Sequence, residues 1–109
     1  MIIYPDPEWF QSLPSELTTQ AIFLAGEAAW LPDAALKVVN WLAEADYVVL
    51  GVELWENCNG SPKWIATSNY EYDQFSNSPE YAKLNFAGAN QFIERFRKHS
   101  GALFNLTVA

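Results

Sequence analysis

Two stretches of the chain repeat apolar residues every three to four positions, the spacing of a helix that buries one face. The first covers residues 33–45 and begins after Pro32, a residue type that the first helical turn tolerates. Its apolar positions are Leu31, Ala35, Val38, Val39 and Leu42. The second begins at Ser78 and Pro79, which suit the N-cap and the first helical position, and Gly101 can end it. Its apolar positions are Ala82, Phe86, Ala89, Ile93 and Phe96.

Other stretches carry the residue types of strands. Residues 47–56 and 63–72 are rich in β-branched and aromatic side chains, and the turn formers of residues 57–62 join them into a predicted hairpin. Residues 102–108 alternate apolar with polar side chains and predict a last strand. Residues 20–25 predict a short strand, although an extension of a helical turn within residues 8–17 is the alternative.

These elements predict an α+β fold, with an antiparallel sheet of three to four strands and two main helices packed on one face. If the strand at residues 20–25 forms, the order is strand, helix, strand, strand, helix, strand, which is the split βαβ pattern. A chain of 109 residues rarely contains two separate cores, so residues 1–109 are expected to form a single domain.

The predicted hairpin separates its side chains onto two faces. If Glu56 lies opposite Lys63, alternation turns one apolar set toward the helices: Val48, Leu50, Val52, Leu54 and Ile65. The opposite face then collects Tyr47, Trp55, Trp64, Tyr70 and Tyr72 around Gly51 and Glu53. Aromatic rings beside a carboxylate are typical of interface anchors. The alternative is that the N-terminal segment covers this face with Tyr4, Trp9 and Phe10.

Charge and composition limit the kinds of partner and of site that the protein can have. Thirteen acids against six bases give a net charge of −7, which disfavours nucleic-acid binding and favours a basic protein partner. The single cysteine, Cys58, excludes an internal disulfide, and no Cys and His cluster could complete a structural zinc site. No signal peptide or membrane span is visible, so we expect a cytoplasmic protein.

Nothing in the sequence predicts a reaction centre. The one histidine, His99, stands among Arg97, Lys98 and Ser100 at a helix end, where a solvated capping role is expected. No phosphate-binding loop, dinucleotide fingerprint, serine-nucleophile or zinc-protease motif occurs. Glu53 and Glu71 are the nearest strand carboxylates, but alternation places them on opposite faces. We therefore expect no catalytic residues, metal or cofactor.

Three runs carry a resemblance to a known family: Trp30-Leu31-Pro32-Asp33-Ala34-Ala35-Leu36-Lys37, Val48-Val49-Leu50-Gly51-Val52-Glu53-Leu54-Trp55, and Thr67 to Tyr72. Over residues 28–96 the chain resembles the bacterial immunity protein 40 family, in which the central strand ends Leu-Gly-Gly-Asp-Val-Tyr. Here Val52 replaces the second glycine, Glu53 the aspartate and Trp55 the tyrosine. The resemblance implies a cytoplasmic, non-enzymatic protein that binds one toxin domain and blocks its action.

Charge and resemblance together predict an immunity protein that covers the active site of a basic nuclease toxin, with carboxylates in place of substrate phosphates. The expected toxin-binding residues are Asp46, Glu53, Trp55, Tyr70, Glu71, Tyr72 and Asp73. Asp46 and Asp73 are expected to act as steering charges. Two other classes stay open: a small intracellular adaptor or regulatory module without a toxin partner, and a carboxylate-based hydrolase.

Overall fold

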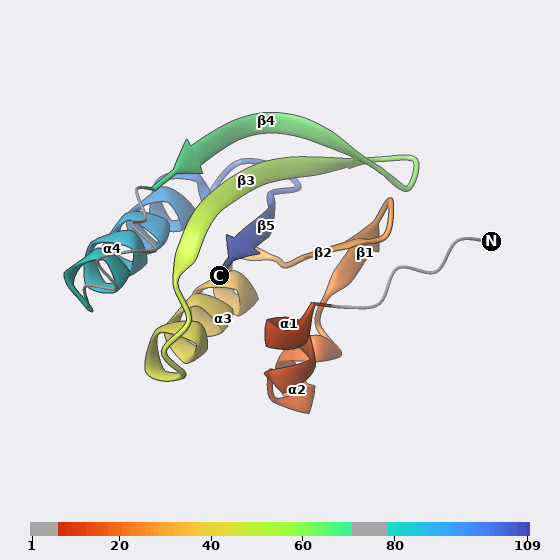
Figure 1. Cartoon of the computed structure of the whole chain (residues 1–109). Coiled ribbons are helices and arrows are strands. Elements are labelled where there is room, and N and C mark those ends of the chain that lie inside the picture. Colours follow the sequence, from red (N-terminus) through yellow and green to blue (C-terminus); the bar gives the residue numbers. More distant parts are fainter. Residues whose placement is uncertain (1–6, 71–78) are drawn as a thin grey trace.

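A three-stranded antiparallel sheet in the order β4-β3-β5 forms the centre of the molecule (Figure 1). The computed structural model describes residues 7–70 and 79–109. Strand β3 (Val49–Cys58) is the central strand, and β4 (Ser61–Asn69) and β5 (Leu103–Val108) pair with its two edges. The predicted α+β class, the hairpin and the last strand are confirmed.

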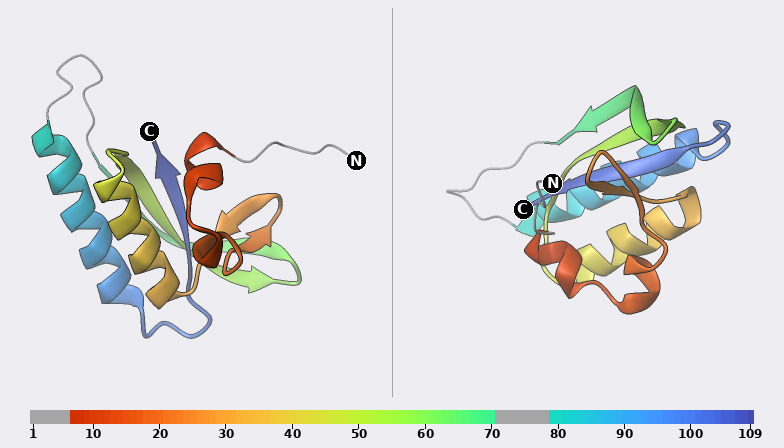
Figure 2. Two further views of the ribbon diagram at one scale, coloured as in Figure 1. Left: turned by 90° about the horizontal axis from the view of Figure 1, so that it is seen from below. Right: turned by 90° about the vertical axis from the view of Figure 1, so that its right-hand side faces the viewer.

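Two long helices cover one face of this sheet. Helix α3 (Pro32–Glu44) and helix α4 (Pro79–Phe96) lie side by side beneath β3 and β5 (Figure 2). The predicted stripes supply most of the buried contacts, with Val38, Val39 and Ile93 fully buried, but Leu31, which directly precedes α3, is 55% exposed and does not join the core. Phe104 of β5 meets the ring of Phe92 edge-on, with 6.2 Å between ring centroids. These contacts join the helices and the sheet into the main hydrophobic core.

The turn between β3 and β4 is tighter than the sequence suggests. The strands continue to Cys58 and Ser61, so only Asn59 and Gly60 remain between them, with φ of 53° and 87°. Two successive residues with positive φ match the right-handed twist of a hairpin, and the side chain of Asn57 accepts a hydrogen bond from the Gly60 amide at 2.8 Å.

The N-terminal part of the described chain forms a second, smaller layer. Two short helices, α1 (Glu8–Ser12) and α2 (Ser15–Thr18), precede a small hairpin of β1 (Ile22–Leu24) and β2 (Glu27–Ala29). The buried indole of Trp30 donates a hydrogen bond to the Leu17 carbonyl at 2.9 Å and so ties α2 to the core.

The predicted strand at residues 20–25 therefore exists, but it does not enter the main sheet. Strand β1 pairs with β2, and among residues 7–70 and 79–109 the backbone pairing onward to β5 is limited to the bridge between Trp30 and Phe104. The split βαβ order is therefore wrong. Ala25 and Gly26, with φ of 51° and 81°, turn the chain back after three residues, so the segment pairs locally.

Candidate functional site

The face of the sheet opposite α3 and α4 carries a polar and aromatic patch near the β4 edge. We define the open-face patch as Glu53 of β3 with Trp64, Thr67 and Asn69 of β4. Glu53 lies opposite Thr67, whose hydroxyl accepts a hydrogen bond from the indole of Trp64. The Trp64 side chain is 61% exposed and belongs to neither hydrophobic core. Such exposure is unusual for so large an apolar side chain. The patch thus joins one carboxylate, one indole and two polar side chains.

Two features of β3 hold this patch in place. The carboxylate of Glu53 accepts a hydrogen bond from the indole Nε1 of Trp55 at 3.1 Å. Gly51 lies beneath Asn69, where a Cβ would stand 3.0 Å from the Asn69 side-chain oxygen and 3.2 Å from the Ser68 carbonyl. A larger residue at position 51 would therefore require the Asn69 side chain and the Ser68 carbonyl to shift by a few tenths of an ångström.

The predicted hairpin register holds only near the turn. Glu56 pairs with Lys63 and Trp55 with Trp64, as expected, but Leu54 pairs with Ala66. Ile65 is thus an extra residue in β4, a β-bulge that shifts every later position by one. Because side chains alternate along a strand, a shift of one residue exchanges the two faces.

The bulge moves Tyr70 to the helix side of the sheet, so its predicted place beside Glu53 is wrong. Its ring lies against Gly88 of α4, where a Cβ would stand 2.7 Å from Tyr70 Cε1. Its backbone amide bonds to the Leu50 carbonyl at 2.9 Å. Burial raises the pKa of the Tyr70 phenol, and nearby Ser68 lowers it by less. The hydroxyl makes no hydrogen bond of standard geometry to a described residue.

Trp55 stays on the face opposite the long helices, but it is only 3% exposed. Leu24 and Ala29 of the β1–β2 hairpin and Leu103 of β5 close over it as a second small core. The prediction that the surface around Trp55 is open is therefore wrong. The alternative, in which an N-terminal segment covers it, is correct. The cover is the small hairpin, however, while Trp9 and Phe10 pack against Trp30, and Tyr4 lies outside the described residues.

Tyr47 and Asp46 lie away from the open-face patch. Tyr47 stacks on Trp41 of α3, with centroids 6.4 Å apart, and so leaves the predicted aromatic face. Asp46 is exposed in the loop between α3 and β3, with a φ of 65°. Glu71, Tyr72 and Asp73 lie outside the described residues. Of the four predicted toxin-binding residues within the described ranges, which are Asp46, Glu53, Trp55 and Tyr70, the structure brings together Glu53 and Trp55.

His99 is not simply solvated. Its Nε2 lies 2.6 Å from a carboxylate oxygen of Glu56 on β3, and the other oxygen of Glu56 lies 3.9 Å from Lys63 Nζ. The side chains of His99 and Glu56 are both about one-third exposed. This link fastens the segment that follows α4 to the β3–β4 hairpin and gives His99 a structural role.

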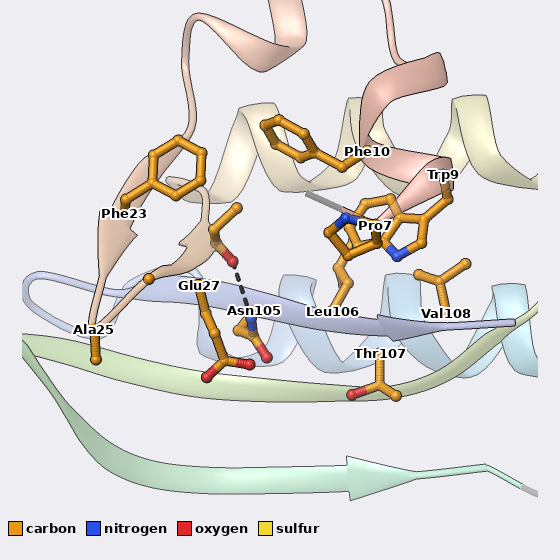
Figure 3. A pocket seen from close by; sticks show the side chains of 12 residues that line it. Pro7, Trp9, Phe10, Phe23, Ala25, Glu27, Asn105, Leu106, Thr107 and Val108 are labelled. Atoms are coloured by element: carbon orange, nitrogen blue, oxygen red, sulfur yellow. Dashed lines mark hydrogen bonds between the residues drawn. The ribbon is translucent and has the colours of Figure 1, made fainter. Parts of the chain in front are cut away.

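A groove of about 570 Å³ opens beside the free edge of β5 (Figure 3). Helix α1 provides Trp9 and Phe10 on one side, and the β1–β2 hairpin provides Phe23 and Glu27 on the other. Residues 105–108 of β5 form its floor. The Asn105 side chain donates a hydrogen bond to the Ala28 carbonyl at 2.9 Å and holds the hairpin at one end of the groove. No sequence pattern had indicated this groove, although Ala25-Gly26 was an available sign of the hairpin.

Charge is unevenly distributed along the chain. The first 36 residues contain no Lys, Arg or His but five acids, which are Asp6, Glu8, Glu16, Glu27 and Asp33. Every Lys and Arg other than Lys63 lies on α3, on α4 or within two residues of the end of α4. Arg97 is also paired with Asp33 and with Glu94, the latter at 3.0 Å. Glu27 is thus the one charged side chain among the described residues that line the groove, and Glu8 and Glu16 stand on the neighbouring short helices, whereas five of the six bases lie on or next to α3 and α4.

Within residues 7–70 and 79–109, no group of three or more His, Cys, Asp or Glu side chains is arranged to hold a metal ion. None of the helices in these ranges has the length and apolarity needed to span a membrane.

Comparison with known proteins identifies the family. The sequence model of the family Immunity protein 40 matches residues 17–108, which includes both long helices, all three strands of the main sheet and the β1–β2 hairpin. No curated protein matches the chain. Because the match spans most of the 109 residues, the chain belongs to the immunity protein 40 family, whose name describes immunity against a toxin.

Proposed function

We propose that this protein neutralises a nuclease toxin by binding it directly, with the acidic side of the sheet against the basic surface around the toxin's active site. Family membership supports the toxin partner. The net charge of −7 supports a basic partner, since a field of one sign attracts the opposite sign and speeds association. A basic surface is what a nuclease presents to nucleic-acid phosphates.

The open-face patch is the part of this surface that we propose as the main contact. It lies on a face that neither α3 nor α4 covers, and it offers an exposed indole beside a carboxylate. A large ring can fill a pocket in the partner while the carboxylate pairs with Arg or Lys. The single observation that carries the proposal is that Glu53 and Trp64 share the uncovered face and are linked through Thr67, which lies opposite Glu53 and accepts the hydrogen bond of the Trp64 indole.

The other predicted contacts take revised roles in the proposal. Asp46 keeps its role as a steering charge because it is exposed, and Glu71, Tyr72 and Asp73 are retained as contacts on the sequence that follows β4. Trp55 holds the Glu53 carboxylate through its indole hydrogen bond and does not itself touch the toxin. Tyr70 is withdrawn, because it packs against α4. The protein acts by occupying the toxin, with no reaction of its own.

Co-expression tests this proposal directly. The toxin domain encoded immediately upstream of the immunity gene is produced together with the tagged protein, and the purified toxin is assayed for cleavage of RNA and DNA. We expect the two chains to co-purify, and cleavage to stop near one equivalent of the immunity protein. A toxin that neither co-purifies nor loses activity with excess protein would contradict the proposal.

A further inference from the structure

One edge of β5 is open along the groove. The N–H and C=O of Phe104 bond to Trp30, on the side away from β3, at 2.8 and 3.0 Å. At the other end, the N–H and C=O of Ala109 bond to Val48 on the β3 side, at 2.8 and 3.0 Å. Because backbone groups alternate between the two edges of a strand, those of Leu106 and Val108 point away from β3.

Within the described residues, β2 does not continue along this edge. The bridge between Trp30 and Phe104 is the only backbone pairing between this part of the described chain and β5, and the β1–β2 hairpin then turns away from the edge. The groove occupies the space left beside residues 105–108. Four strand residues span about 13 Å, enough to pair with three or four residues of an added strand.

The walls of the groove indicate the side chains that such a strand would carry. The sides toward α1 and the hairpin are aromatic, formed by Trp9, Phe10 and the half-exposed Phe23. The lower rim carries Glu27, which lies beside Asn105 and extends toward the outer face of the sheet (Figure 3). Asn105 pairs in register with Glu53, so this rim continues into the open-face patch. A strand with alternating apolar and basic side chains fits both walls.

Charge argues against a second copy of this chain as the occupant. Two copies would bring together two grooves, each with Glu27 on its rim and no Lys, Arg or His among its described lining residues, and each within a chain of charge −7. Like charges across an interface cost free energy and slow association. A basic partner would instead be attracted to this region and would associate faster.

We infer that β5 receives an extended, basic and apolar segment of the toxin, which adds a strand to the sheet in the groove between α1 and the β1–β2 hairpin. This inference rests on the proposed function and adds backbone pairing to it. Main-chain hydrogen bonds provide affinity in this mode of recognition, and side chains in flanking pockets provide specificity. The groove and the open-face patch then bind neighbouring parts of one partner.

Amide hydrogen exchange tests the open edge without any substitution. We expect the amides of Leu106 and Val108 to exchange quickly in the free protein and about 100-fold more slowly in the complex with the upstream-encoded toxin domain. Slow exchange of both amides in the free protein at low concentration would show that the chain's own residues occupy the edge. Slow exchange that appears only as the free protein is concentrated would show a second copy there. Either result overturns the inference.

A matched pair of substitutions tests the backbone contact itself. Val108→Pro removes the N–H at the open edge, a position where strands tolerate proline, whereas Val108→Ala shortens the side chain and keeps the N–H. We expect Val108→Pro to weaken toxin binding at least about tenfold and Val108→Ala less than about threefold. Glu27→Lys should also weaken binding, whereas Glu44→Lys, on the last turn of α3 and outside the groove, should not.

The outcomes separate the two proposals. If the wild-type protein does not bind the toxin, both proposals fail. If the wild-type protein binds, but the Val108 variants bind equally and the two amides stay unprotected in the complex, the added strand is excluded and direct neutralisation stands. The exchange measurement decides the matter even if Val108→Pro does not fold.

Discussion

The indole Nε1 of Trp55 donates a hydrogen bond of 3.1 Å to the carboxylate of Glu53, two residues earlier on β3. Trp55 is buried beneath the β1–β2 hairpin, whereas Glu53 is half-buried on the open-face patch. The small hairpin therefore fixes the position of a charge on the open face, although no residue of the hairpin belongs to the patch. A preorganised carboxylate loses less conformational entropy when it binds a cation.

The substitution Glu53→Gln should separate charge from structure. The glutamine side chain keeps an oxygen that can accept a hydrogen bond from the Trp55 indole, so the free energy of unfolding should change by less than about 0.5 kcal/mol. Toxin binding should weaken, most clearly at low salt, because the negative charge is lost. Urea denaturation and binding measured at two salt concentrations check both parts. An unchanged affinity at low salt would remove the charge from the interface.

Truncation of Trp64 should affect binding and leave the fold intact. Its side chain is 61% exposed, so Trp64→Ala should change the free energy of unfolding by less than about 1 kcal/mol. Toxin affinity should fall at least about tenfold, the effect of removing an aromatic anchor. Leu84→Ala on α4 is the control, because Leu84 is 68% exposed on the helix layer. Equal affinities for the two variants would place the interface elsewhere.

The effect of Gly88→Ala on the free energy of unfolding should change sign when the Tyr70 ring is removed, which a double-mutant cycle can measure. Gly88→Ala alone places a Cβ 2.7 Å from the Tyr70 ring and should destabilise the protein by about 1 kcal/mol, since overpacking outweighs the gain in helix propensity. In a Tyr70→Ala background the same substitution should stabilise by up to about 1 kcal/mol. Urea denaturation of the four proteins measures this. Stabilisation by Gly88→Ala in both backgrounds would mean that Tyr70 does not pack there.

The raised pKa of Tyr70 predicts a loss of stability in alkali. Burial in the folded protein favours the neutral phenol and so contributes to the free energy of unfolding. This contribution is complete below the pKa of about 10 that tyrosine has in the unfolded chain, and it is lost as the pH rises through the higher pKa of the folded protein. Tyr70→Phe cannot ionise and should lose less stability than the wild type between about pH 9 and pH 11. Thermal unfolding across this range compares the two proteins. Parallel curves would show that Tyr70 is not buried.

Near neutral pH, Tyr70→Phe should be nearly neutral or slightly stabilising. The hydroxyl has no hydrogen bond of standard geometry among the described residues, so its removal costs no such bond. Destabilisation by more than about 1 kcal/mol at pH 7 would indicate a partner for this hydroxyl.

Local sequence signals predicted the elements well. The apolar stripes of α3 and α4 depend on helical spacing alone, and the stripe residues Val38 and Ile93 are buried as predicted. Glu56 and Lys63 are also paired as expected, because a short turn fixes the register next to it.

The failures have a different origin. Nothing in the residues around Ile65 marks a bulge, yet this one extra residue moved Tyr70 from one face to the other. The cover over Trp55 depends on contacts between residues 24–29 and residue 103, far apart in sequence. Local patterns do not record such long-range packing, so the predicted aromatic surface was larger than the open-face patch that exists.

The affinity of the Glu53→Lys and Glu16→Lys variants for the upstream-encoded toxin domain tests the central claim most directly, by calorimetry with the wild type alongside. Both variants change the net charge equally, but Glu16 lies exposed on α2, outside the open-face patch. We predict a loss of about 100-fold or more for Glu53→Lys and, for Glu16→Lys, at most a slower association with nearly unchanged affinity. Equal affinities for the two variants would show that the acidic, indole-bearing face of the sheet does not bind the toxin.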